Sequence, residues 1–197
     1  MKKILFCLFM ISTSFIFANQ ICLENPSTLG GTGWTNNEQT NAGTYGYVHG
    51  MWGNEVPYVE KTFSTSGNQT NITISFRYWA VDTWDTETGY LNFNGSQLWS
   101  KTVTTYNTAS GWDVYAGTFP APWSGGTLKR YADVTVTTAF TGTSFTLRFG
   151  STINEVESNE SWGFSALAIS DNVVPEPATL VIFCIALGIL GLGKFRK

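Results

Sequence analysis

Acidic side chains gather in two short stretches of the sequence, and the chemistry that they suggest is the binding of a hard cation. Residues 82–87 carry three carboxylates directly after a predicted strand, and residues 155–160 carry three more just before one. Calcium takes roughly six to eight oxygen ligands, and two loops at one end of a fold could share an ion. The alternative is that these acids are solvated or cap strand ends. The candidate calcium ligands are Asp82, Asp85, Glu87, Glu157 and Glu160.

Tryptophan is the second residue type with chemical potential, since the chain contains eight. So many large rings are not expected to fit one core. We predict that Trp84, in the first acidic stretch, and Trp123, in a Pro/Gly-rich loop, expose flat faces on which sugar rings stack. The alternative is that tryptophan fills a core poor in leucine and that each indole N–H finds a carbonyl.

Residues for catalysis are scarce. His49 is the only histidine, and no nucleophile motif surrounds it. A retaining glycosidase needs two carboxylates about 5 Å apart, which here would have to be Asp82 or Glu87 with Glu160. We therefore predict a non-catalytic domain and keep a glycan-acting enzyme as the third hypothesis.

The elements that position these residues are predicted to be strands, because strand formers dominate residues 19–172 and no helical period is present. In residues 70–82, Ile72, Ile74, Phe76 and Tyr78 alternate with residues of the other face and are expected to point into the core. Asn94-Gly95 is typical of a two-residue hairpin turn. The remaining predicted strands are 44–48, 56–63, 89–93, 97–103, 112–119, 131–137, 144–149 and 161–169.

Short strands at this spacing indicate one all-β domain, residues 19–172, folded as an antiparallel β-sandwich. We favour jelly-roll topology because the first and last strands can then lie beside each other. Between the two ends of the chain, residues 19–177 carry six basic and fourteen acidic residues, a net charge of −8. Nucleic acid is therefore excluded as a partner. Cys22 is the only cysteine of this part, so no disulfide can form within it.

The first eighteen residues have the pattern of a secretory signal peptide. Lys2 and Lys3 precede an apolar run, 4–17, and Ala18 is the small residue at which we expect the cut.

The last twenty-five residues predict a membrane segment. Pro175, Glu176 and Pro177 precede an apolar run, 178–192, and a basic end closes the chain. As a helix the run would span roughly 22 Å at about 1.5 Å per residue. That is shorter than a ~30 Å hydrocarbon core, but flanking cations can reach the interface. The basic end favours the cytoplasmic side, which leaves the body of the protein outside.

This Pro-Glu-Pro, apolar helix and basic end resemble the PEP-CTERM sorting signal of Gram-negative bacteria. The resemblance implies that a membrane protease-transpeptidase, exosortase, recognises the tail and cuts it near Pro175, Glu176 and Pro177. Exosortase genes lie with those for exopolysaccharide production. The implied route is export, a transient stay in the inner membrane, and then the cell surface or extracellular matrix.

Residues 81–87 and 160–164 also resemble a pair of segments found in some extracellular jelly-roll-like domains. With the tail, this favours a non-catalytic binding or structural module associated with exopolysaccharide, stabilised by calcium. The alternative is an adhesive or structural surface protein with protein partners and no affinity for sugar.

Overall fold

The computed structural model describes residues 17–173 except 107, 122 and 124–127. The first sixteen residues of the predicted signal peptide, the predicted apolar helix and the sorting residues Pro175, Glu176 and Pro177 lie outside the described residues. In the described part, no helix is long and apolar enough to cross a membrane. The single helical element there is a 3-10 turn, η1 (Gly43–Tyr45).

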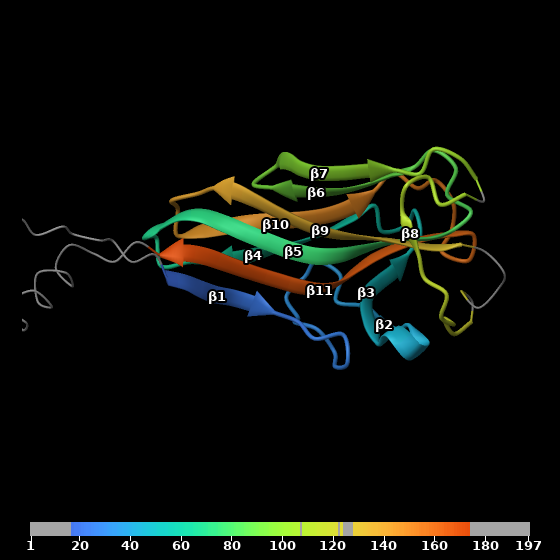
Figure 1. The fold of residues 1–197 in the computed structure, drawn as a ribbon, viewed down its shortest axis with the longest axis horizontal. Helices are drawn as coiled ribbons and strands as arrows, with labels where there is room; N and C mark the ends of the chain where they lie inside the picture. Colours follow the sequence, from blue (N-terminus) through green and yellow to red (C-terminus); the bar gives the residue numbers. More distant parts are fainter. Residues whose placement is uncertain (1–16, 107, 122, 124–127, 174–197) are drawn as a thin grey trace, which may run out of the picture.

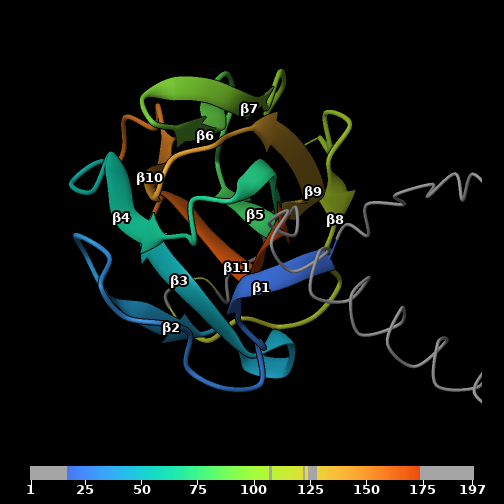
Figure 2. The ribbon, with the colours of Figure 1, turned by 90° about the vertical axis from the view of Figure 1, so that its left-hand side faces the viewer.

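Two antiparallel sheets face each other, and their inner faces enclose the core (Figure 1; Figure 2). The large sheet has the order β2 (Gln39–Asn41), β3 (Tyr47–Trp52), β11 (Glu160–Val173), β5 (Gln69–Asp82), β9 (Lys129–Ala139) and β8 (Asp113–Val114), with β1 (Phe17–Leu23) also paired to β11. The small sheet has the order β4 (Tyr58–Ser64), β10 (Ser144–Ser151), β6 (Thr88–Phe93) and β7 (Ser96–Thr102).

The strand order confirms a jelly roll. The eight main strands, in chain order, are β3, β4, β5, β6, β7, β9, β10 and β11. In this count, the large sheet places the first, eighth, third and sixth strands side by side. The small sheet takes the second, seventh, fourth and fifth. Every ladder is antiparallel, and the last strand lies beside β1 and β3, as the predicted topology requires.

The alternation in the longest predicted strand is confirmed. In β5, Ile72, Ile74, Phe76 and Tyr78 are buried in the main core. They pack there against aromatic rings of β10 and β11: Phe76 meets Phe149 edge-on at 4.9 Å, and Tyr78 stacks on Trp162 at 6.0 Å. The Asn94-Gly95 turn joins β6 to β7 with positive φ at both residues, as a hairpin of this type needs.

Two predicted strands are wrong in extent. Residues 44–48 begin in the 3-10 turn, and the strand starts only at Tyr47. Residues 112–119 form only the short β8, because the chain leaves the sheet edge and folds over its outer face. There Phe119 and Trp123 are buried in an apolar cluster with Trp79 of β5.

That outer face holds a second apolar cluster. Trp79, which alternates with the core-facing residues of β5, points away from the main core but is fully buried beneath the segment that follows β8. Its indole Nε1 donates to Ser165 Oγ at 2.9 Å, and the ring meets Tyr115 and Phe119 edge-on. Seven of the eight tryptophans are buried and Trp99 is partly buried, but they do not share one core, because Trp79 and Trp123 belong to this second cluster.

The two ends of the described chain emerge together. Phe17 pairs with Val173, so β1 starts where β11 finishes (Figure 1). The fourteen residues of β11 span roughly 40 Å at the rise of a strand. The acidic loops next to the start of β11 are therefore at the opposite end of the sandwich, which we call the distal pole.

Candidate functional site

The distal pole brings the two acidic stretches together, as two loops of one sandwich end can. Both the backbone N–H and the hydroxyl of Thr83 donate to the carbonyl of Asn159, at 3.0 and 2.7 Å. Across the ladder, Asp82 of β5 pairs with Glu160 of β11. The loops are thus joined by backbone hydrogen bonds and by the last rung of the sheet.

The five predicted calcium ligands do not converge. Asp82, Glu87 and Glu160 are buried, whereas Asp85 and Glu157 are exposed. Among the described residues, no group of three or more His, Cys, Asp or Glu side chains is placed to hold a metal ion. The donor set therefore does not form a preformed calcium site.

The surroundings of the three buried acids shift their pKa values in different directions. Burial opposes ionisation of Glu87, but the N–H groups of Asp85 and Thr86 donate to its Oε2 at 2.6 and 3.0 Å and leave its pKa below the ordinary value. Burial, and then the nearby charge of Glu87, raises the pKa of Glu160. Burial also raises the pKa of Asp82, against the attraction of Lys129 and Arg130.

The two exposed acids, Asp85 and Glu157, have different surroundings at the distal pole. Partial burial of its carboxyl group, and then repulsion from Glu55 and Glu38, raises the pKa of Glu157. Asp85 instead lies on the rim of an open depression of about 540 Å³. The other described residues that line it are Thr83, Tyr106, Asn154, Glu155, Asn159 and Glu160.

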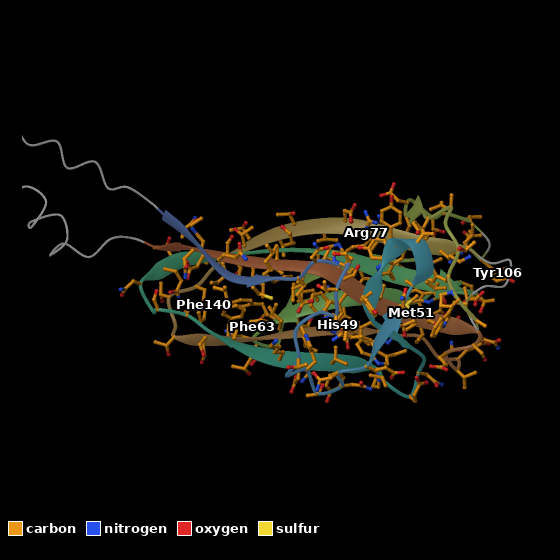
Figure 3. All side chains as sticks on the ribbon, turned by 90° about the horizontal axis from the view of Figure 1, so that it is seen from below. His49, Met51, Phe63, Arg77, Tyr106 and Phe140 are labelled. Carbon is orange, nitrogen blue, oxygen red and sulfur yellow. The ribbon has the colours of Figure 1, made fainter. Side chains whose placement is uncertain are left out.

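Tyr106 is the aromatic residue at this depression. Its side chain is 46% exposed, and it projects at the far end of the molecule from Phe140 (Figure 3). Amide groups of Asn154 and Asn159 and the hydroxyl of Thr83 complete a lining that is mostly polar. One flat ring beside several hydrogen-bonding groups is a surface that suits a sugar ring. Sequence reasoning missed Tyr106 because nothing in the threonine-rich stretch around it predicts its place.

The predicted stacking residues are located elsewhere, and this corrects the prediction. Trp84 is fully buried, and its Nε1 donates to the carbonyl of Ser161 at 3.0 Å. Trp123 is 8% exposed, and its Nε1 donates to Ser161 Oγ at 2.9 Å. Both rings lock the start of β11 in place, so neither offers a free face to a ligand. The alternative reading, tryptophan as core filler with its N–H bonded, describes both.

His49 is not among the described residues that line the depression, and its side chain is buried. It is 2% exposed, its Nε2 lies 2.8 Å from Glu24 Oε2, and its ring stacks on Phe164. The arrangement pins the segment after β1 against β3 and β11.

The pKa values of the buried Glu87 and Glu160 are shifted in opposite directions, so their charges should affect stability at neutral pH with opposite sign. A carboxyl with a raised pKa contributes stability that is complete below its unfolded pKa and lost as pH rises through its folded pKa; a lowered pKa has the opposite sign. We expect Glu160→Gln to raise the melting temperature at pH 7 by about 2 °C or more, and Glu87→Gln to lower it by a similar amount. The effect of Glu160→Gln should disappear as pH falls below the ordinary glutamate pKa of 4.5. The effect of Glu87→Gln should persist there and be lost only at lower pH, where Glu87 is protonated in the folded protein. Melting curves between pH 3 and 8 test this, with Asp113→Asn, an exposed carboxylate that does not act on either glutamate, as control. A loss of stability in Glu160→Gln would contradict the prediction.

Comparison with known proteins gives a sequence match for the C-terminal tail and structural similarities for the folded domain. Residues 173–197 match the PEP-CTERM protein-sorting motif. No curated protein matches the chain. Among solved structures, dimeric latent PorU of Porphyromonas gingivalis is similar over 81% of this chain and 12% of its own, with 11% identity and a TM-score of 0.43. This chain thus corresponds to a small part of PorU.

Two smaller structures are similar over most of their own length. The sugar-binding EclA C-terminal domain has 10% identity and a TM-score of 0.37 over 83% of both chains. The carbohydrate-binding module CBM36, solved with calcium and xylotriose, has 14% identity and a TM-score of 0.32 over 79% of this chain and 99% of its own. Such values assign no ligand to this chain. The last residues do assign a destination: the chain carries the PEP-CTERM motif of exosortase-sorted surface proteins.

Proposed function

We propose that this protein is exported by its signal peptide, held briefly in the inner membrane, released by exosortase, and retained in the exopolysaccharide matrix by its β-sandwich. The sandwich binds without catalysis. The observation that carries the sorting part is the motif at residues 173–197, with Pro175, Glu176 and Pro177 as the recognised signal.

The depression at the distal pole is the proposed contact with the glycan. Because Phe17 and Val173 leave the fold at the opposite end, a chain still anchored by its tail presents this pole away from the membrane. Tyr106 supplies the stacking face, and Asn154, Asn159 and Thr83 supply hydrogen bonds to hydroxyl groups. The acids around it disfavour a strongly anionic chain, so the proposed ligand is a neutral polysaccharide.

The test is co-sedimentation of the purified full chain with the producer's own exopolysaccharide. We expect Tyr106→Ala to weaken binding about fivefold or more, because removing a central aromatic contact costs on the order of 1 kcal/mol or more. The matched control is Tyr58→Ala, which removes a ring of similar exposure (40%) outside the depression. Each measurement is made with calcium and with chelator, which reports whether calcium takes part.

The other outcomes separate the remaining hypotheses. If the parent chain does not bind the polysaccharide in either condition, the adhesive alternative with protein partners replaces the proposal. Equal weakening by Tyr106→Ala and Tyr58→Ala would move the contact away from the distal pole. New reducing ends that disappear in Glu160→Gln would reveal an enzyme.

A further inference from the structure

One buried carboxylate has no partner in the part of the chain that the structure describes. Asp171 of β11 is 1% exposed, and neither of its side-chain oxygens accepts a hydrogen bond there. None of the ion pairs between described residues includes it. A buried carboxylate without a partner is strongly destabilising, so a folded protein is expected to supply one.

The position of Asp171 indicates where a partner could come from. Two and four residues before it, Ile169 and Leu167 point into the main core, so Asp171 shares their inner face. It lies near the end where the described chain starts and finishes. Its cross-strand neighbours are Ile72 of β5, which is apolar and buried, and Asn19 of β1.

Asn19 is the residue that the predicted signal-peptide cut turns into the N-terminus. Hydrolysis of the bond after Ala18 leaves the new carboxylate on Ala18 and the amine on Asn19. That amine is protonated at neutral pH, since an α-amino group has a pKa near 8. A neutral amide N–H thus becomes a cation with three donors, on a residue whose Cα pairs directly with that of Asp171. Directly paired residues lie about 4.5–5.5 Å apart, within reach of an aspartate side chain.

We infer that the α-ammonium group of Asn19, created when the signal peptide is removed, is the ion-pair partner of the buried Asp171. The inference rests on the predicted cut after Ala18 and is independent of glycan binding. In the precursor, Phe17 and Ala18 extend β1 along β11 and the charge does not exist. In the exported chain the cation completes the edge of the large sheet. The sandwich therefore reaches its full stability only after export.

The experiment displaces the new N-terminus without changing the sandwich. Two residues, Gly-Ser, are inserted between Ala18 and Asn19 of the full chain, which is exported by a host without exosortase and purified in detergent. Intact mass establishes the first residue of each product. We expect the insertion to lower the melting temperature by about 5 °C in the parent chain and by less than about 1 °C in Asp171→Asn, where no carboxylate needs a partner.

A matched variant separates this pair from a general effect of charge. Asp133→Asn removes an exposed carboxylate of the same sheet, one that binds Arg77, and the insertion should cost that variant as much as it costs the parent. The inference is overturned if the insertion is harmless in the parent, if it costs Asp171→Asn equally, or if the exported parent begins at a residue other than Asn19.

Discussion

Replacing Pro175, Glu176 and Pro177 with alanine should abolish release of the protein and leave it in the inner-membrane fraction. The apolar run 178–192 and the basic end are unchanged in this variant, so the predicted membrane insertion and orientation should be retained. What is lost is the polar segment that we propose as the recognised part of the motif. Immunoblots of membrane, surface and medium fractions measure the outcome, and we expect release to fall to background.

Two controls make this result specific. Pro57→Ala changes a proline in the described domain and should be released as the parent is. A host that lacks exosortase should retain the parent chain in the membrane, as the triple variant is retained. Normal release of the triple variant would show that other residues of the tail carry the signal.

The second large effect is expected from Trp84→Ala, which should destabilise the sandwich. The ring is fully buried, packs edge-on to Trp112 at 6.3 Å, and donates its N–H to the carbonyl of Ser161. Truncating a buried tryptophan to alanine costs about 3–5 kcal/mol, and the melting temperature of a domain of this size falls about 2–4 °C per kcal/mol. We therefore expect a loss of about 10 °C, measured by thermal unfolding at pH 7.

This variant also decides between two roles for the residue. If Trp84 stacks on a sugar, Trp84→Ala should lose glycan binding and keep its melting temperature. If Trp84 is a core residue, Trp84→Ala should melt at a lower temperature and still bind glycan below that temperature. Leu29→Ala, at a side chain 64% exposed, is the control for truncation of an apolar residue and should melt as the parent does. An unchanged melting temperature in Trp84→Ala would overturn the structural role.

The candidate site was only partly predictable from the sequence. The two acidic stretches do meet, because each adjoins a strand end and those strands pair. Their side chains nevertheless separate: Glu87 accepts hydrogen bonds from its own loop, and of the five predicted ligands only Asp85 and Glu160 are among the described residues that line the depression. Side-chain direction in a loop depends on backbone turns that have no repeating pattern, so spacing alone could not predict it.

Local patterns in the sequence are sufficient to predict several features of this protein. Alternation along β5, the Asn94-Gly95 turn and the strand-rich composition predict an antiparallel sandwich, because side chains two apart share a face and a turn type limits the connection. The sorting tail is equally a local signal. The burial of individual rings and the lining of the distal pole, in contrast, depend on contacts between distant segments. Trp79, Trp84 and Trp123 are buried by segments distant in sequence, and Tyr106 joins Asn159 across more than fifty residues, because burial is a property of contacts that the chain makes only once it is folded.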